Sequence, residues 1–212
     1  MKKTILFDLD GTLTDSGEGI IKCSALALRH FGIKVPDDNA MRVFVGPPLH
    51  ETFVKFGIPD DKADEAVEIY RSRYNTVGKF ENHPYPGIAE LLHTLKSNGN
   101  RLLVATSKPE ALSVEILEKF QLAQYFDRIC GASLDRSRSS KEAVIAYLLQ
   151  EYPDTENMVM VGDTALDILG AKVHGIAAIG VSWGYGDVEQ MRQAGAVAIA
   201  DSIEKLQDLL MK

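Results

Sequence analysis

Apolar residues recur along the chain in short runs that alternate with longer stretches of helical spacing. The first run, from Thr4 to Leu9, is apolar on consecutive positions, which is typical of a parallel strand covered on both faces. Similar runs follow at 102–105, 128–130, 158–161, 177–181 and, more weakly, 196–199. Helical patterns separate these runs from about residue 87 onward. This alternation predicts an α/β fold with a doubly wound parallel sheet.

The stretch between Asp15 and Glu81 departs from this alternation, because it contains helical patterns and no convincing strand. Its clearest helix follows a candidate cap at Asp60 or Asp61 and has one apolar face. That face comprises Ala63, Ala66, Val67, Tyr70, Tyr74 and Val77. We therefore predict a Rossmann-like core domain at 1–14 and 82–212, a helical domain inserted at 15–81, and hinges at 15–17 and 83–87.

Composition narrows the classes of protein. The chain has 212 residues, with 23 basic and 30 acidic side chains and a net charge of -7, which argues against nonspecific binding to nucleic acid or to an anionic membrane. No segment approaches the ~18 apolar residues of a membrane span. Cys23 and Cys130 match neither a metal-ligand spacing nor a disulfide framework. We expect a soluble, cytoplasmic protein with reduced, inert cysteines, and nothing in the chain demands a protein partner.

Two acids stand at the end of the first predicted strand, in the segment Asp8-Leu9-Asp10-Gly11-Thr12. Ionised carboxylates in partly dry surroundings repel each other and lose hydration, so they persist mainly where a cation offsets both effects. Mg²⁺ with a phosphorylated substrate is the obvious candidate. An Asp-Gly hairpin is disfavoured because helical spacing follows the turn. A calcium loop of the EF-hand kind is disfavoured because Gly19 stands where Glu is required.

In open parallel sheets ligands bind beyond the carboxyl ends of the strands, so the residues at those ends are candidates. Thr106, Ser107 and Lys108 end the second long apolar run and lead into Pro109, a residue favoured at the first helical position. The amides of Ser107 and Lys108 would then lie at a helix N-terminus, which suits phosphate binding. The alternative is that Thr106 or Ser107 merely caps that helix.

Further acids follow a later strand, where Gly162 and Asp163 end the run 158–161. A helix starting near Thr164 would direct Asp163 and Asp167 toward the same corner. Asp167 could equally serve as a capping-box acid in the first helical turn. A third carboxylate at the same edge of the sheet strengthens the case for a divalent ion.

Lys141 is the most informative cation. Ser139 or Ser140 is a natural N-cap for the following helix, which places Lys141 in its first turn. A lysine there opposes the helix dipole by roughly 0.3–1 kcal/mol, which indicates an anionic partner. The alternative is a solvated surface lysine. Arg136 and Arg138 either bind substrate or are simply exposed.

In their order along the chain, these motifs resemble the haloacid dehalogenase superfamily of phosphatases and phosphotransferases. The resemblance rests on Asp-x-Asp-Gly-Thr at 8–12, Thr106, Lys141, and Gly162-Asp163 with Asp167. The helical insert is similar to the C1-type cap of that superfamily, and the nearest subgroup is that of phosphoglycolate phosphatase. One departure is that the segment 135–141 before Lys141 lacks the Lys-Pro-x-Pro-like sequence that this subgroup often shows.

The resemblance implies a role for each matching residue. Asp8 would attack phosphorus and form an aspartyl-phosphate, while Asp10 would act as general acid and base. Thr106 would hydrogen-bond the transferring phosphoryl group, and Lys141 would steady the nucleophile and the developing charge.

The resemblance also implies a magnesium site and substrate contacts. Mg²⁺ would be bound by Asp8, Asp163, the backbone carbonyl of Asp10, and Asp167 directly or through water. Apart from the resemblance, the loop Gly46-Pro47-Pro48-Leu49 of the cap, with nearby Arg42, is a candidate substrate-facing loop; the alternative is that Pro47-Pro48 only ends one helix and begins another. The predicted substrate-binding residues are Gly11, Thr12, Ser107, Lys108, Arg42 and Arg138.

The sequence therefore predicts a Mg²⁺-dependent phosphatase that acts on a small phosphomonoester such as phosphoglycolate, a nucleoside monophosphate or a sugar phosphate. Uncatalysed hydrolysis of such esters is so slow that accelerations of up to ~10²¹ are needed, and several groups must act together. One alternative is a phosphomutase of the β-phosphoglucomutase type. Another is a receiver-like signalling module that is phosphorylated on aspartate, although such a module has no need of a helical cap.

Overall fold

The computed structural model describes residues 2–133, 135 and 137–212. Their contacts divide the chain into two compact units. The first, called the α/β unit below, combines the N-terminal segment up to Thr14 with Pro84–Lys212. The second, called the helical unit, is Asp15–His83. None of the helices within the described residues is long and apolar enough to cross a bilayer.

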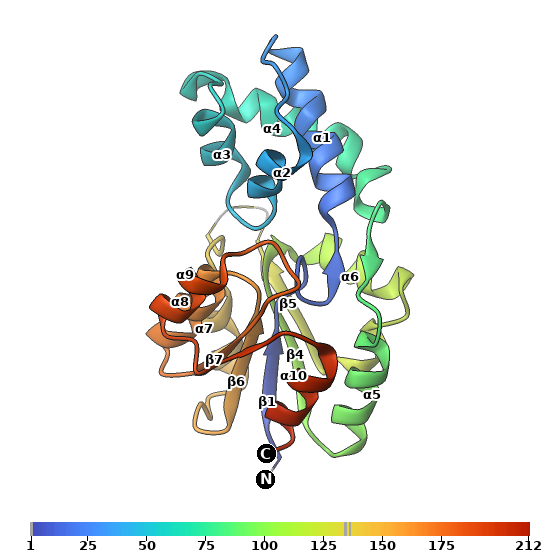
Figure 1. Ribbon diagram of the computed structural model, residues 1–212, viewed down its shortest axis with the longest axis vertical. Helices are drawn as coiled ribbons and strands as arrows, with labels where there is room; N and C mark the ends of the chain where they lie inside the picture. Colours follow the sequence, from blue (N-terminus) through green and yellow to red (C-terminus); the bar gives the residue numbers. More distant parts are fainter. Residues whose placement is uncertain (1, 134, 136) are drawn as a thin grey trace. The chain divides into compact units, whose positions relative to one another are not determined.

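The α/β unit contains a six-stranded sheet in the order β5-β4-β1-β6-β7-β8. Figure 1 labels the first five of these strands. Every neighbouring pair of strands in this sheet is parallel, which confirms the predicted α/β fold. In the central strand, Phe7 lies opposite Val104 on one side and Val161 on the other. The strands are β1 Thr4–Phe7, β4 Arg101–Pro109, β5 Arg128–Ala132, β6 Met158–Gly162, β7 Ala177–Val181 and β8 Ala198–Ala200.

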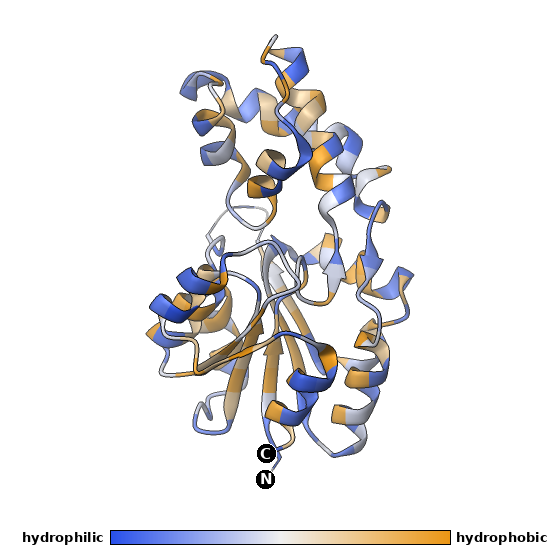
Figure 2. Ribbon diagram, viewed as in Figure 1, coloured by the Kyte–Doolittle hydropathy of each residue, from blue (hydrophilic) through white to orange (hydrophobic). Residues whose placement is uncertain are grey.

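Helices cover both faces of this sheet. Alternate residues of a strand point to opposite faces, so consecutive residues pack against different helices. Ile5 and Phe7 belong to a core cluster that includes residues of three helices, whereas Leu6 belongs to a second cluster formed with three others. Figure 2 shows hydrophobic strands between helices whose outer faces are polar. The first group is α5 Ile88–Ser97, α6 Glu110–Lys119 and α10 Ile203–Leu210; the second is α7 Lys141–Glu151, α8 Ala165–Val173 and α9 Val188–Ala194.

The first strand ends two residues earlier than the apolar run predicts. Leu9 is fully buried, but its carbonyl accepts hydrogen bonds from the amides of Leu13 and Thr14, so the chain already turns there. The amide of Asp8 still donates to the carbonyl of Val161 at 2.9 Å. Asp8 is therefore held at the carboxyl end of the sheet, at the start of a tight loop.

The helical unit has its own apolar core. Phe44 lies between Phe53 and Phe56, with ring centroids 5.0 and 4.7 Å away, and Tyr70 stacks on Tyr74. Its elements are α1 Gly17–His30, α2 Asp38–Met41, η1 Arg42–Phe44, α3 Leu49–Lys55, η2 Asp60–Lys62, α4 Ala63–Tyr74 and η3 Gly78–Phe80.

Helix α4 carries the apolar face that the sequence predicts, since Ala63, Ala66, Val67, Tyr70 and Tyr74 are all buried. The predicted cap is wrong. The two candidate aspartates lie in the 3-10 turn η2, and the helix begins after Lys62 without a side-chain cap. Val77, which the sequence also predicts on this face, lies beyond the end of α4 and is exposed.

The two segments that connect the units form a separate two-stranded sheet from β2 Thr14–Asp15 and β3 His83–Pro84. On either side of this sheet, the amide of Tyr85 donates to Leu13 and the amide of Gly19 donates to Glu81. These hydrogen bonds show that the two segments run antiparallel. Of the residues predicted as hinges, Asp15, His83 and Pro84 therefore lie in paired strands, and the hinge role stays a prediction.

Candidate active site

Asp8 and Asp10 occupy a loop whose shape depends on glycine. Gly11 has a φ of +81°, a backbone conformation that residues with a side chain rarely adopt, and its amide donates to the carbonyl of Thr14 at 2.8 Å. A Cβ at this position would also collide with the carboxylate of Asp163. The Asp-Gly pair therefore brings the first acidic segment close to an acid that follows a neighbouring strand.

The acids Asp8, Asp163 and Asp167 form a compact buried cluster. One carboxylate oxygen from each lies within 4.8 Å of the others. Asp8 follows β1, Asp163 follows β6, and Asp167 lies in the first turn of α8. Because β1 and β6 are adjacent parallel strands, their carboxyl ends meet at one edge of the sheet, as the spacing predicts.

Lys141 closes this cluster. Its Nζ lies 2.8 Å from Oδ1 of Asp8 and 2.7 Å from Oδ1 of Asp167, and it donates to the carbonyl of Ala105 at 2.8 Å. The side chain is only 5% exposed. Lys141 is the first residue of α7, and the hydroxyl of Ser140 caps this helix by accepting from the amide of Ala143. The predicted cap and first-turn position are confirmed, and the anionic partners of the lysine include protein carboxylates.

The cluster contains three acids, Asp8, Asp163 and Asp167, but only one basic side chain, Lys141. Burial, followed by the charges of Asp167 and Asp8, raises the pKa of Asp163 to about 8. Burial also raises the pKa of Asp8, although Lys141 and a hydrogen bond from Thr106 oppose the shift. Burial works against the ammonium of Lys141, but the charges of Asp167 and Asp8 outweigh it and raise its pKa. The cluster therefore favours additional positive charge.

The donor set fits a divalent cation. Carboxylate oxygens from Asp8, Asp163 and Asp167 are the hard ligands that Mg²⁺ prefers, and Lys141 neutralises one of their three charges. The side chain of Asp10 lies outside this group of oxygens. Its predicted part in metal binding, through the backbone carbonyl, stays a prediction.

Asp167 has two functions within the described structure. Its Oδ2 accepts from the amide and the hydroxyl of Thr164, at 3.0 and 2.8 Å, which completes a capping box at the start of α8. Its Oδ1 faces Lys141. The capping interpretation and the cluster interpretation of Asp167 are therefore compatible, because each uses a different oxygen.

The second predicted strand reaches the same edge but continues further than expected. Strand β4 runs to Pro109, which pairs with Ala132 after an irregularity in the register, and α6 begins only at Glu110. The expectation that Ser107 and Lys108 lie at the helix N-terminus is wrong, because both residues belong to β4, which ends only at Pro109. The amide of Lys108 instead donates to Oγ1 of Thr106 at 3.3 Å.

Lys108 reaches Asp10 rather than open solvent. Its Nζ lies 2.5 Å from Oδ2 of Asp10, and the two side chains are 6% and 12% exposed. The other carboxylate oxygen of Asp10 is buried without a hydrogen-bond partner. Thr12, predicted to bind substrate, is fully buried and its hydroxyl donates to Oδ1 of Asp163 at 3.2 Å.

Sequence reasoning missed the loop that follows β7. The amide of Tyr185 donates to Oδ2 of Asp163 at 2.8 Å, and side chains at Gly184 or Gly186 would collide with Asp163. The indole of Trp183 donates to the carbonyl of Thr12 at 3.2 Å. The signal was available, because this glycine-rich loop stands at the carboxyl end of an identified strand.

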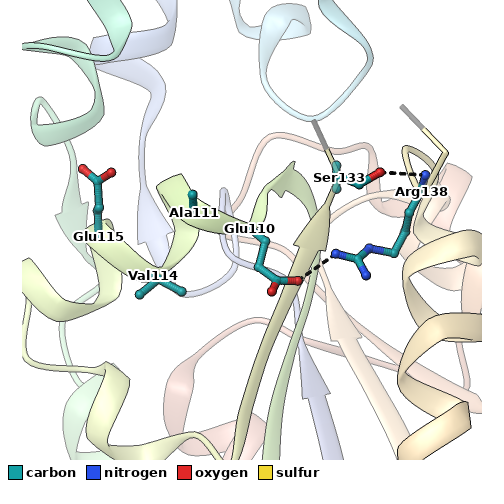
Figure 3. Close-up of a pocket in the computed structure, with 7 residues that line it drawn as sticks. Glu110, Ala111, Val114, Glu115, Ser133 and Arg138 are labelled. Atoms are coloured by element: carbon teal, nitrogen blue, oxygen red, sulfur yellow. Dashed lines mark hydrogen bonds and ion pairs between the residues drawn. The ribbon is translucent and has the colours of Figure 1, made fainter. Parts of the chain in front are cut away.

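Arg138 contacts residues outside the cluster of Asp8, Asp163 and Asp167. Its guanidinium pairs with Glu110 at 2.8 Å (Figure 3). It also donates to the carbonyl of Gly131 and lies over the ring of Tyr147. It also lines an open pocket of about 530 Å³ that contains none of the clustered acids, so we do not assign this pocket as the active site. The substrate contact of Arg138 stays a prediction, and Arg136 lies outside the described residues.

Two other predictions fall elsewhere. Arg42 is an exposed residue of η1 in the helical unit, and its substrate contact stays a prediction. The loop of Gly46, Pro47 and Pro48 lies between η1 and α3. Both cysteines are free and buried, and burial raises the pKa of Cys130 to about 11, in line with an unreactive thiol.

Comparison with known proteins gives consistent matches over nearly the whole chain. The profile of haloacid dehalogenase-like hydrolases matches residues 5–181. The 5'-nucleotidase of Pseudomonas aeruginosa is 43% identical over 190 residues, which cover 89% of this chain and 86% of that protein. The crystal structure of a predicted phosphatase from Clostridium acetobutylicum superposes with a TM-score of 0.95 at 42% identity, covering 100% of this chain and 99% of that one.

Relatives of other stated activities are also similar. The tyrosine-protein kinase PtkA of Mycobacterium tuberculosis is 42% identical over 209 residues, which cover 97% of this chain and 72% of that protein. The phosphoglycolate phosphatase of Vibrio parahaemolyticus is 28% identical over 218 residues, which cover 98% and 96%. The similarity thus extends to enzymes that transfer or release phosphate.

Proposed function

Since the chain belongs to the haloacid dehalogenase-like hydrolase family, we propose that it is a Mg²⁺-dependent phosphatase that hydrolyses a small phosphomonoester through an aspartyl-phosphate. The observation that carries this proposal is the buried cluster of Asp8, Asp163 and Asp167 around Lys141. A bound Mg²⁺ would be held by these carboxylates and would supply charge that offsets the phosphoryl oxygens.

Asp8 is the proposed nucleophile. Its Oδ1 is fixed by Lys141 at 2.8 Å and by the amide of Leu9 at 2.7 Å, so the carboxylate is oriented before the substrate arrives. As an oxygen of Asp8 bonds to phosphorus, the bond from phosphorus to the leaving oxygen breaks. Lys141 and the hydroxyl of Thr106, which both contact Asp8, are the proposed donors that stabilise the charge developing around the phosphoryl group.

Asp10 is the proposed general acid and base. In the first step it gives a proton to the leaving oxygen, and in the second it takes a proton from the water that attacks phosphorus. The bond between phosphorus and Asp8 breaks in that second step, which returns the carboxylate and releases inorganic phosphate. The two acids therefore divide the chemistry, with Asp8 forming the covalent bond and Asp10 moving the proton.

The helical unit is proposed to act as a cap that excludes water from the site and selects the leaving group. Its residues, predicted as 15–81, would then determine which phosphomonoester is hydrolysed. Arg42 and the loop from Gly46 to Pro48 are the proposed substrate-facing elements of this cap. Gly11, Ser107 and Arg138 remain proposed contacts of the substrate in the α/β unit.

Among small phosphomonoesters, a nucleoside monophosphate is the first candidate. The supporting observation is the 43% identity to a 5'-nucleotidase, against 28% identity to a phosphoglycolate phosphatase. Phosphoglycolate and sugar phosphates are the next candidates. The named relatives favour hydrolysis over the phosphomutase and the receiver-like module.

A second candidate function is transfer of the phosphoryl group from Asp8 to a protein tyrosine. It is favoured by one observation, the 42% identity to a protein named as a tyrosine kinase. An aspartyl-phosphate can in principle be attacked by a hydroxyl other than that of water, and the identity of the acceptor then separates the two functions.

The test is phosphate release from a panel of nucleoside monophosphates, phosphoglycolate, sugar phosphates and p-nitrophenyl phosphate, with Mg²⁺ or with a chelator. The Asp8→Asn variant should lose turnover by roughly 10⁴-fold or more and keep its fold. The matched control is Asp208→Asn, the same change at an exposed position of α10. Undiminished turnover in Asp8→Asn would exclude the proposed nucleophile. In the same assay with a tyrosine-containing peptide added, transfer of phosphate from a donor of the panel to the tyrosine instead of to water would favour the kinase.

A further inference from the structure

Two lysines reach the acidic edge of the sheet, and each contacts different acids. Lys141 pairs with Asp8 and Asp167, whereas Lys108 pairs with Asp10. Both lysine side chains are nearly buried, at 5% and 6% exposed. Buried ion pairs of this kind are held in one geometry by the surrounding packing, in contrast to exposed pairs. The arrangement assigns a separate cation to each acid of the first motif.

The pairing of Lys108 with Asp10 is set by two neighbouring strands. Asp10 follows β1, Lys108 lies near the end of β4, and the strands are adjacent and parallel. Two donors spaced two residues apart thus meet two acids with the same spacing. Thr106 contributes its hydroxyl to Asp8, and Lys108 contributes its ammonium to Asp10.

The two oxygens of Asp10 are in different situations. Oδ2 accepts from Nζ of Lys108 at 2.5 Å. Oδ1 is buried and has no hydrogen-bond partner. A buried carboxylate oxygen without a partner is unusual and needs an explanation, such as a catalytic task.

We propose that Lys108 is a positioning residue, which fixes Oδ2 of Asp10 and thereby makes Oδ1 the oxygen that exchanges the proton. In the first step the proton on Oδ1 passes to the leaving oxygen as its bond to phosphorus breaks. In the second step a proton passes from the attacking water to Oδ1. Lys108 keeps its own proton throughout and balances the charge of Asp10 after donation. This inference rests on the proposed phosphatase function.

The assignment differs from direct phosphate binding by Lys108, which the sequence predicts, and the two roles have different kinetic consequences. A lysine that binds phosphate should matter equally for every ester. A lysine that acts through a general acid should matter most for alcohols that leave poorly, and least for p-nitrophenol, which leaves without a proton.

The experiment measures kcat and KM of Lys108→Met with an alkyl phosphate that wild type hydrolyses and with p-nitrophenyl phosphate. General acid–base catalysis contributes roughly 10²–10⁴-fold, so we expect kcat/KM for the alkyl ester to fall by about 10-fold to 100-fold. For p-nitrophenyl phosphate kcat/KM should change by less than about 3-fold. In Lys108→Met the second step, hydrolysis of the aspartyl-phosphate, should become slow because its general base is impaired. With p-nitrophenyl phosphate the variant should therefore show a burst of p-nitrophenol, and its kcat and KM should fall together.

Several outcomes overturn the inference. One is an equal loss for both esters with a raised KM, which indicates direct phosphate binding. Another is a loss in Asp10→Asn/Lys108→Met that equals the product of the two single losses, because residues acting as a unit are not additive. Unchanged kinetics in Lys108→Met would also overturn it.

The controls separate this inference from its premise. Lys205→Met, at an exposed position of α10, should match wild type. The ratio of the two kcat/KM values does not depend on the folded fraction, so it remains informative if Lys108→Met is destabilised. If wild type hydrolyses no ester, the proposed function fails as well. If wild type is active and the losses are equal, only the role of Lys108 fails.

Discussion

Each unit contains a cluster of opposite charges, and one acid in each cluster has its pKa shifted in the opposite direction to the other. At the sheet edge, Asp163 has its pKa raised to about 8, whereas in the helical unit Glu81 has its pKa lowered to about 2. Glu81 accepts two hydrogen bonds from Arg73, at 2.6 and 2.9 Å, and one from Lys22 at 3.0 Å. The charge of Lys141 also acts to lower the pKa of Asp163, but burial and the charges of Asp167 and Asp8 outweigh it. A base in the same cluster therefore does not by itself decide the direction of the shift.

The number of charges and their burial explain the difference. In the helical unit, Arg73 and Lys22 face Glu81 and Glu18, so cations and anions are equal in number and partly solvated. At the sheet edge, three buried carboxylates lie together, and Lys141 pairs with two of them, Asp8 and Asp167. A balanced cluster is complete in itself and serves stability. A cluster with excess buried negative charge is one that a cation would complete, and this distinguishes a candidate site from a structural ion pair.

The largest expected loss of stability and turnover comes from removing Lys141, and the matched comparison removes Arg73 from the cluster of the helical unit. Lys141→Met leaves three buried acids without a cation, so we expect a loss of about 3–5 kcal/mol in unfolding free energy without metal. Turnover should also fall by roughly 10²–10³-fold because a donor to the developing charge is lost. Arg73→Met should retain turnover. Calorimetry and phosphate release check both. Equal effects of the two variants on turnover would contradict the distinction between the clusters.

Much of this contrast is visible in the sequence, for physical reasons. The apolar runs predict the strands because parallel strands are buried on both faces, and the carboxyl ends of β1 and β6 then bring Asp8 and Asp163 together. The position of Lys141 follows from the cap at Ser140, because capping is a local interaction.

Other features depend on register and backbone, which local patterns do not reveal. The pairing of Lys108 with Asp10 joins residues 98 positions apart through the irregular end of β4. The glycine-rich loop after β7 can be located from the sequence, but its contact with Asp163 is made by the backbone amide of Tyr185, so the identity of that side chain does not reveal the contact. The sequence predicts that α6 starts at Pro109, whereas the helix starts at Glu110, because proline suits both a helix start and an extended segment.

The second prediction concerns the binding of Mg²⁺ to the acid cluster at the sheet edge. We expect Mg²⁺ to change the fluorescence of Trp183, the single tryptophan, because its indole donates to Thr12, whose hydroxyl contacts Asp163. Asp163→Asn should weaken this response by about 10-fold to 100-fold in Mg²⁺ concentration, a scale known for groups around metal sites. Glu81→Gln is the control from the balanced cluster and should bind as wild type. The measurement needs no turnover. An unchanged midpoint in Asp163→Asn would contradict the metal assignment.

The third prediction uses pH. Because the pKa of Asp163 is raised from 3.8 to about 8, the folded protein binds a proton that the unfolded chain releases. This contribution to stability is therefore lost as pH rises from about 4 to 8 in metal-free protein. Mg²⁺ should reverse the trend, since it binds the ionised form, and should raise the melting temperature more at pH 8 than at pH 5. The same increase at both values would show that Asp163 is not linked to metal.

The smallest effect is expected in the balanced cluster, and its sign is opposite. The lowered pKa of Glu81 stabilises the fold above its ordinary value of 4.5, and this contribution is lost as pH falls through about 2. Glu81→Gln should therefore reduce unfolding free energy at neutral pH by about 1 kcal/mol or less, as for partly exposed pairs. Its difference from wild type should vanish in acid, while turnover at neutral pH is unchanged. A loss of turnover would mean that this ion cluster has a catalytic part, and that balanced charge does not identify a structural site.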